Sequence, residues 1–458
     1  MFTSCPSSMT VLQGFFTKMV IEKRVSKALV LENNTAEDVS RAMIEGGLQK
    51  DPFYIFDMDK AYQRVQYFKN MMPRIKIFYA VKSNDSDFML KLAASLGLGF
   101  DCASPGEIHK VLKLRVSPLS IVFAMPTKSP EWMLYARQCG IKHTTFDNLC
   151  ELNKIKQFWP DAKLLLRIRV HSDSVYDLGK KFGCDFETEA IDLLEEAAAL
   201  NITVVGIAFH VGSGCSSPDS YVLGLQQVKQ LFEHEAKAGR KMKIVDVGGG
   251  FLSDKTDRID KVSKLINNAI EELFPDPEVQ VIAEPGRYLC DNSFTLYCNI
   301  NTVRPVQVGD SSINMLYLND GVFGCLRYNE PWHTVKRFRV HSEGEQLKPT
   351  VLWGPTCHPI DRVLDNLVIM LPACTIYDWL VFPSRGAYSM TMASRFSTLP
   401  EPHIRSVISQ ELFNILKDSK VLGLDDFLEQ NIATPLPPTL PSIIVHSKIL
   451  QTNYTLAV

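Results

Sequence analysis

The chain has 458 residues, of which 46% are hydrophobic, with 49 Lys and Arg against 51 Asp and Glu. This length predicts two or three domains, or one large barrel with a companion domain. The balanced charge, without a dense basic stripe, argues against a nucleic-acid-binding surface. No apolar run reaches about 18 residues, so no membrane-spanning segment is expected.

The cysteines indicate a reducing environment. Eleven of them are scattered along the chain without any Cys-x-x-Cys pair, which argues against a zinc ribbon and against a disulfide scaffold. Charged residues interrupt the apolar N-terminal stretch early, unlike in a secretory signal. We therefore expect a cytoplasmic protein with reduced thiols.

Eight short apolar, β-rich runs alternate with helical patterns such as Thr188–Leu200. The runs are Lys76–Lys82, Gly99–Ser104, Ile121–Pro126, Lys142–Asp147, Lys163–Val170, Val204–Gly212, Lys243–Gly250 and Val279–Tyr288. This alternation predicts the α/β class, with a parallel (β/α)8 TIM-like barrel. A doubly wound open sheet is the alternative.

The rhythm changes after about residue 290, where strand patterns follow one another and predict a second, mostly antiparallel β domain. Its expected strands are Phe294–Val306, Met315–Leu318, Val351–Trp353 and Trp379–Phe382, followed by a helix over Ser406–Leu422 and a Pro-rich tail at Pro435–Pro441. The expected domains are 1–50, a segment packing with the β domain; 51–290, the barrel; and 291–458, the β domain with its tail.

Polar or glycine-bearing clusters end most of the barrel strands, on the side where barrel enzymes carry their chemistry. They contain Lys82, Asp101, Arg167, His210, Gly248, Gly249, Gly250, Glu284 and Arg287. Any one of these alone is more often structural than functional. Their convergence on one rim predicts a site.

The residue types at this rim favour pyridoxal phosphate as cofactor. A lysine can bond to the aldehyde, a carboxylate can pair with the ring nitrogen, and a histidine can stack on the ring. The glycine triplet does not fit the dinucleotide fingerprint, yet its backbone N–H groups and Arg287 can bind a phosphate. The ten histidines show no metal-ligand spacing, so no metal is expected.

At these residues the chain resembles the eukaryotic ornithine decarboxylase family of barrel-type pyridoxal-phosphate decarboxylases. The matching segments are FYAVKSND (78–85), GFDCAS (99–104), FHVGSGC (209–215), VDVGGGF (245–251), AEPGRY (283–288), NDGVFG (319–324), WGPTC (353–357) and GAYS (386–389). They run in order from about residue 50 to about residue 400.

The resemblance implies a role for each matching position. Lys82 corresponds to the cofactor-bonding lysine, His210 to the stacking histidine, and Glu284 to the partner of the ring nitrogen. The phosphate-binding positions are Ser213, the glycine triplet Gly248 to Gly250, Arg287 and Tyr388, and the polar residues beside the cofactor are Asp101, Glu107 and Arg167.

The family is a homodimer with shared active sites, so the resemblance implies a homodimer here. Cys357 is similar to the cysteine that the neighbouring subunit contributes and that returns a proton after carbon dioxide leaves. Lys181 and Asp361 match a pair that bridges the family's dimer interface.

The chain departs from the family where ornithine's distal ammonium is bound by two aspartates. One of these positions is His358, and the other matches Asn329 in the Tyr328–Asn329 step. No aspartate occurs between Asp320 and Asp361. Enclosing an ammonium without a carboxylate costs several kcal/mol. The chain is therefore predicted to decarboxylate a neutral, aliphatic amino acid, with leucine as the representative.

Two alternatives stay open. One is an ornithine decarboxylase of polyamine synthesis in which Glu330 compensates for the missing aspartates. The other is a non-catalytic regulator like the family's antizyme inhibitors, which bind antizyme. Such relatives lose cofactor-site residues, whereas this chain keeps the full set, which favours an enzyme. Antizyme as a partner cannot be read from the chain.

Overall fold

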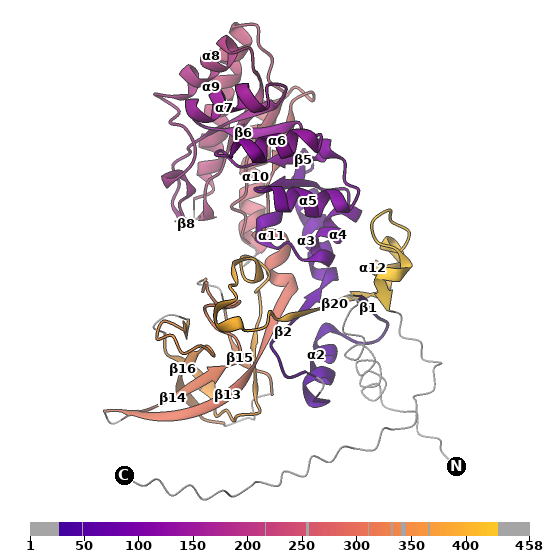
Figure 1. Ribbon diagram of the computed structural model, residues 1–458, viewed down its shortest axis with the longest axis vertical. Helices are drawn as coiled ribbons and strands as arrows, with labels where there is room; N and C mark the ends of the chain where they lie inside the picture. Colours follow the sequence, from indigo (N-terminus) through magenta and orange to yellow (C-terminus); the bar gives the residue numbers. More distant parts are fainter. Residues whose placement is uncertain are drawn as a thin grey trace, which may run out of the picture.

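The computed structural model describes residues 27–47, 49–215, 217–252, 256–309, 311–330, 333–339, 345–364 and 367–428. The expected N-terminal arm before residue 27 and the Pro-rich tail lie outside these ranges. Figure 1 shows two parts, a helix-covered barrel and a sheet domain next to it, joined where β2 and β13 meet the barrel helices.

The barrel is closed by eight parallel strands. In spatial order they are β11 (Ile244–Asp246), β12 (Gln280–Ala283), β3 (Ile75–Ala80), β4 (Gly99–Cys102), β5 (Ile121–Phe123), β6 (His143–Phe146), β7 (Lys163–Ile168) and β9 (Thr203–Phe209). Each strand falls within or beside one of the eight predicted runs. The predicted TIM-like barrel is confirmed, and the open sheet is excluded.

Helices connect the strands and cover the outside of the barrel. They are α3 (Met58–Met71), α4 (Asp87–Ser95), α5 (Pro105–Lys113), α6 (Pro130–Gln138), α7 (Leu149–Phe158), α8 (Ala190–Ala199), α9 (Asp219–Lys237), α10 (Thr256–Leu273) and the short α11 (Arg287–Cys290). Their starts are encoded locally: Ser104, Ser129 and Asn148 cap α5, α6 and α7 through their side chains. No helix in the described ranges is long and apolar enough to cross a membrane.

Apolar side chains fill the barrel interior. Phe78, Val122, Leu165, Ala208 and Ile282 form a buried cluster separate from the larger core between strands and helices. Because alternate residues of a strand point to opposite faces, each strand serves both cores. With the interior filled in this way, a ligand can reach the polar residues only from the rim.

The second domain is built on a mixed sheet of 11 strands in which most pairings are antiparallel. Its main order is β17 (Arg362–Val363), β16 (Leu347–Trp353), β14 (Ser311–Leu318), β13 (Phe294–Val308), β2 (Phe53–Asp57), β20 (His403–Ser409), β1 (Ala28–Leu31) and β21 (Phe427–Leu428). The strands β15 (Lys336–Arg337), β18 (Ile369–Pro372) and β19 (Trp379–Phe382) pair beside this path, and α2 (Ala36–Glu45) packs next to β2.

Two segments that flank the barrel in the sequence join this sheet. β2 pairs with β13 and β20, and β1 pairs with β20 and β21. The N-terminal described residues therefore complete the sheet that the C-terminal half begins. The exact domain limits at residues 50 and 290 stay a prediction.

The expected helix over Ser406–Leu422 begins later than predicted. Residues up to Ser409 belong to β20, which lies in parallel between β1 and β2, and α12 spans only Gln410–Leu416. The buried run at the end of β20 is ambiguous between strand and helix in sequence. The Ser409 hydroxyl marks the true boundary, because it accepts the Leu412 N–H at 3.1 Å as an N-cap.

Candidate active site

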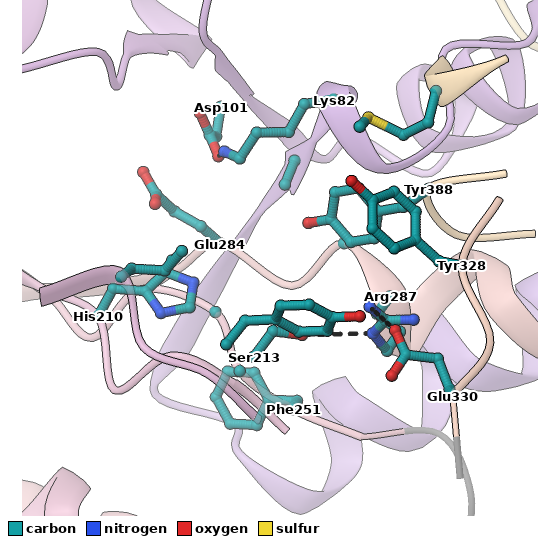
Figure 2. A pocket seen from close by; sticks show the side chains of 17 residues that line it. Lys82, Asp101, His210, Ser213, Phe251, Glu284, Arg287, Tyr328, Glu330 and Tyr388 are labelled. Atoms are coloured by element: carbon teal, nitrogen blue, oxygen red, sulfur yellow. Dashed lines mark hydrogen bonds and ion pairs between the residues drawn. The ribbon is translucent and has the colours of Figure 1, made fainter. Parts of the chain in front are cut away.

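A cavity of about 350 Å3 opens at the carboxyl-end rim of the barrel. It brings together most of the residues predicted from sequence, with residues of the β domain added (Figure 2). The polar and glycine lining comprises Lys82, Asp101, Tyr176, His210, Ser213, Gly249, Gly250, Glu284, Gly286, Arg287, Tyr328, Glu330 and Tyr388, and the apolar lining Ala80, Leu178, Phe251 and Met392. This volume suits a small organic ligand.

Lys82 and Asp101 form an ion pair at one end of the cavity. Lys82 lies in η1 (Val81–Ser83), a short 3-10 turn directly after β3, and Asp101 lies in β4. The two neighbouring strands therefore place these side chains together. Burial alone lowers the lysine pKa, but the charges of Asp101 and then Glu284 outweigh it and raise that pKa. The amine is therefore held protonated and aimed into the cavity.

Glu284 follows β12 and points into the cavity beside a second buried acid, Asp246, which the sequence reasoning missed. Burial, then the negative charges of Asp101 and Asp246, raise the Glu284 pKa well above its usual range. Burial likewise raises the Asp246 pKa to about 7, although its Oδ1 accepts the Gly248 N–H at 2.9 Å. One oxygen of Glu284 is buried without a hydrogen-bond partner. A cationic N–H from a ligand would relieve this crowding of negative charge.

His210 is held as a neutral ring. Its Nδ1 accepts the Gly212 N–H at 2.9 Å, which leaves Nε2 as the protonated nitrogen. Burial, then the positive charges of Arg167 and Lys82, keep its pKa well below the usual range. Arg167 does not line the cavity and acts on it only through this charge, while its guanidinium lies 5.5 Å from the Phe182 ring centroid.

The glycine turn after β11 needs residues without side chains. Gly248 and Gly250 adopt φ of +67° and +99°, in the left-handed region. A Cβ on Gly249 would lie 2.8 Å from the Glu284 carbonyl oxygen and 3.0 Å from His210 Nε2. The triplet thus lets backbone approach the cavity where any side chain would block it, as a phosphate cradle requires.

Arg287 begins α11 at the other end of the cavity from Lys82 (Figure 2). Its Nε donates to Ser213 Oγ at 3.3 Å, and its guanidinium lies 5.1 Å from the Tyr388 ring centroid. Its Nη2 lies 2.9 Å from Glu330 Oε1, with both side chains almost fully buried. The predicted phosphate-binding residues Ser213, Arg287 and Tyr388 therefore lie together, and the Glu330 carboxylate contacts Arg287 among them.

The Tyr328–Glu330 segment shows which neighbour faces inward. Tyr328 and Glu330 line the cavity, whereas Asn329 does not. The Asn329 side-chain oxygen instead accepts from Arg385 at 3.5 Å, and the same guanidinium donates to the Tyr328 carbonyl at 2.6 Å. The sequence predicted Tyr328 and Asn329 as specificity residues, and Glu330 only as the carboxylate that compensates in the ornithine decarboxylase alternative.

The β domain is tied to the turn that carries Lys82. Tyr388 adopts φ of +54°, and its backbone N–H donates to the Ser83 carbonyl at 2.9 Å. The Asn84 side chain donates to the Gly386 carbonyl at 2.8 Å. These two bonds fix the Tyr388 ring beside the cavity.

Glu107 lies outside the cavity lining. It is in the first turn of α5, where its carboxylate accepts the Ala103 N–H at 2.6 Å and its own N–H donates to Ser104 Oγ at 3.2 Å. Burial raises its pKa to about 7 despite the Ala103 hydrogen bond, with a further rise from the charge of Asp101. Glu107 thus supports the segment that follows Asp101.

Cys357 and His358 are exposed on the β domain and do not line the cavity. The His358 ring lies 5.3 Å from the Phe323 ring, which stacks on Phe396 at 4.4 Å. Nearby Ile360 is 63% exposed. The predicted proton donor and specificity residue therefore form an apolar and aromatic surface patch apart from the cavity of their own chain.

Among the described residues, one cluster of side chains could supply several metal ligands. It consists of Glu195, His234 and Glu235 on the outer helices α8 and α9. Arg240 forms ion pairs with both glutamates, at 2.7 Å and 2.6 Å. The guanidinium already supplies the positive charge that a metal ion would bring, so this group is an ion-pair network.

The cavity fits pyridoxal phosphate. The amine of Lys82 faces the cavity, and one oxygen of Glu284 is buried there without a hydrogen-bond donor. The glycine turn and Arg287 line the same cavity. The neutral His210 ring borders the same space. These features supply a partner for each polar end of such a cofactor: the aldehyde, the ring nitrogen and the phosphate.

Comparison with known proteins agrees with this chemistry. Residues 58–291 match the pyridoxal-binding domain of the pyridoxal-dependent decarboxylases. The chain is 33% identical to the ornithine decarboxylase of Rattus norvegicus, covering 93% of this chain and 92% of that protein. It is 36% identical to that of Panagrellus redivivus, covering 87% and 94%.

Solved structures show the same fold. The Paramecium bursaria Chlorella virus arginine decarboxylase bound to agmatine superposes with a TM-score of 0.76 at 32% identity, over 81% of this chain and all of that one. The lysine/ornithine decarboxylase of Vibrio vulnificus complexed with cadaverine gives 0.72 at 27% identity, over 81% and 99%.

The fold, the cavity and these matches define a pyridoxal-phosphate-dependent carboxy-lyase of the barrel type. Within that class, the chain belongs to the eukaryotic ornithine decarboxylase family. The expected family, fold, cofactor and enzyme class are confirmed.

Proposed function

We propose that this enzyme decarboxylates a neutral, aliphatic L-amino acid, represented by leucine, to the amine and carbon dioxide. The observation that carries the proposal is the state of Glu330. It is the carboxylate of the Tyr328–Glu330 segment in the cavity, and it is already paired with Arg287 at 2.9 Å. A distal ammonium would have to compete with a guanidinium for it. Leu178, Phe251 and Met392 offer apolar contacts instead.

The residues of this chain have separable roles in the reaction. Lys82 presents the amine that bonds to the cofactor, and Asp101 orients it. Glu284 would hold a proton on the ring nitrogen, while the neutral His210 ring would pack against the ring face. Pyridoxal phosphate supplies an electron-withdrawing ring that stabilises the negative charge left on the α-carbon when carbon dioxide departs.

The phosphate would be held by Ser213, the N–H groups of the glycine turn, Arg287 and Tyr388. Because these groups come from several strand ends and from the β domain, they orient the cofactor without chemistry of their own. Burial, and then the positive charge of Arg167, lower the His210 pKa and keep its ring neutral.

The proton that replaces carbon dioxide would come from Cys357 of a second copy of the chain. In its own chain this thiol is exposed and does not line the cavity, and the ring of the adjacent His358 packs near Phe323, which stacks on Phe396. A homodimer that buries this patch would carry Cys357 and His358 to the partner's cavity. His358 would then border the distal end of the substrate without a negative charge.

One observation favours ornithine as the second candidate substrate. The second carboxylate oxygen of Glu330, Oε2, is buried without a hydrogen-bond partner. A distal ammonium reaching this oxygen would make Glu330 a substitute for the family's aspartates.

A non-catalytic regulator that binds antizyme is not favoured, because the cavity keeps its cofactor residues. Mixing the purified protein with antizyme on a size-exclusion column tests that partner separately. The cytoplasm is the proposed location, based on the reduced cysteines.

A carbon dioxide release screen tests the substrate. Leucine, isoleucine, valine, methionine, phenylalanine, ornithine, lysine and arginine are compared by kcat/KM on the cofactor-loaded protein. We expect the best activity on a medium apolar side chain, with overlap among aliphatics because one methylene is worth only about 1–3 kcal/mol. His358→Asp should lower activity on that substrate, with His403→Asp, exposed on β20, as the control. Efficient ornithine turnover by the unmodified enzyme would contradict the proposal.

A further inference from the structure

The ion pair between Arg287 and Glu330 is buried in the wall of the cavity. The two side chains are 6% and 3% exposed, and their charged atoms lie 2.9 Å apart. At such burial neither charge is screened by water, so each strongly affects whatever charge approaches the other.

A hydrogen bond to His333 holds the backbone of Glu330 in place. Its backbone N–H donates to His333 Nδ1 at 3.0 Å. Burial, then the positive charges of Arg385 and Arg287, lower the His333 pKa to about 2, so this imidazole is neutral and does not cancel the charge of Glu330. The carboxylate therefore faces Arg287 with its full charge.

The same arginine also contacts the groups proposed to bind phosphate. Arg287 donates to Ser213 and lies against the Tyr388 ring, beside the glycine turn. A phosphate arriving there would meet an arginine whose charge Glu330 already neutralises. It would also bring two negative charges towards a carboxylate whose free oxygen has no hydrogen-bond partner.

We propose that Glu330 is a positioning residue that competes with the cofactor's phosphate for Arg287 and thereby weakens cofactor affinity. Phosphate binding requires the guanidinium to be shared between two anions, or the carboxylate to turn away from it. Tyr176 lines the cavity with Glu330. Burial, and then the negative charge of Glu330, raise the Tyr176 pKa, so the two side chains already interact and the hydroxyl can stay a partner of a carboxylate that turns away from Arg287. The inference rests on the proposed role of Arg287. It also bears on the substrate, because a Glu330 carboxylate that turns away from Arg287 is no longer paired with a guanidinium when substrate binds. The affinity for the cofactor can be measured without substrate.

Equilibrium titration of the cofactor-free, full-length protein tests this competition. Pyridoxal phosphate and pyridoxal, which lacks the phosphate, are titrated separately and followed by absorbance. Glu330→Gln should lower the Kd for pyridoxal phosphate about tenfold, equivalent to ~1.4 kcal/mol, because the amide keeps the shape and removes the charge. The Kd for pyridoxal should change less than about twofold, because pyridoxal has no phosphate for the Glu330 carboxylate to repel.

Glu235→Gln is the matched control. Glu235 is also buried and paired with an arginine, Arg240, at 2.6 Å, but on the outer helix α9. It should leave both Kd values unchanged. Arg287→Gln should weaken pyridoxal phosphate binding and spare pyridoxal.

Each contrary outcome has its own meaning. Unchanged or weaker binding of pyridoxal phosphate by Glu330→Gln overturns the competition, as does equal tightening for both ligands. If Arg287→Gln leaves the Kd for pyridoxal phosphate unchanged, Arg287 does not bind the phosphate, and the proposal is wrong for that reason. Should Glu330→Gln not fold, as judged by circular dichroism, Glu330→Ala carries the same expectation, because it removes the same charge.

Discussion

The rim of the barrel and the exposed edge of the β domain carry the two halves of the proposed chemistry, and they differ in how complete they are. At the rim, Lys82, Asp101, Glu284 and Arg287 converge on one cavity within a single chain. At the edge, Cys357 and His358 lie on the surface beside aromatic and apolar side chains, and neither lines the cavity at the rim.

This difference separates binding from turnover. A single chain holds the groups proposed to bind the cofactor, so cofactor binding should survive changes at the exposed edge. In the proposed mechanism, proton delivery and substrate choice depend on residues that reach a cavity from another copy of the chain. Variants on the two sides should therefore fail in different ways.

The largest expected effect is at the rim. Lys82→Ala should abolish the visible and near-ultraviolet absorbance of bound cofactor and lower kcat by about a thousandfold or more, since the amine that bonds to the cofactor is lost. Among the described cavity-lining residues Lys82 is the single lysine. Lys76→Ala, at the exposed start of the same strand, is the control for absorbance spectra and turnover. Retained absorbance would contradict the role of Lys82.

A smaller effect is expected at the edge. Cys357→Ala should keep the cofactor absorbance but lower correct product formation by about a hundredfold, as for loss of a general acid. Cys150→Ala, another exposed cysteine, should have no effect. Mixing Cys357→Ala with Lys82→Ala protein should restore part of the activity, because one site of each mixed dimer receives both intact residues. Mixed dimers that form without any rescue would place the complete site in one chain.

The smallest effect concerns support of the rim. The Glu107 pKa is raised to about 7 in the folded protein, so between its ordinary value and pH 7 the folded state binds more protons than the unfolded state. Stability should fall as pH rises through this window, by about 2–3 kcal/mol between pH 5 and 8. Glu107→Gln should remove this contribution while its amide oxygen still accepts the Ala103 N–H. Urea unfolding of both cofactor-free proteins at several pH values measures the difference, and parallel pH profiles would refute it.

The barrel could be predicted because its strands are short, apolar and separated by helical patterns, and because strand ends carry the polar residues. The end of β20 could not be predicted, because a buried run followed by an amphipathic stretch has the pattern of one continuous helix. Only the Ser409 cap divides it.

The site was predictable where a residue directly ends a strand, as for Lys82 and Glu284. Asp246 was missed because an acid inside a buried strand reads as one more core position, although the glycine turn after it was a signal. Asn329 and Glu330 are neighbours in a loop, and no periodicity tells which one faces inward. The Arg385 guanidinium donates to the Asn329 side chain outside the cavity, and this contact leaves Glu330 as the residue that faces inward.

The bonds from Ser83 and Asn84 to the Gly386–Tyr388 segment bear on the order in which the molecule is assembled. Asn84 and Gly386 are 302 positions apart in the sequence. The turn that carries Lys82 is synthesised early, yet its last backbone and side-chain partners come from near the end of the described chain, and such distant contacts close late in folding. A nascent chain can therefore complete these two bonds only after the Gly386–Tyr388 segment has been synthesised.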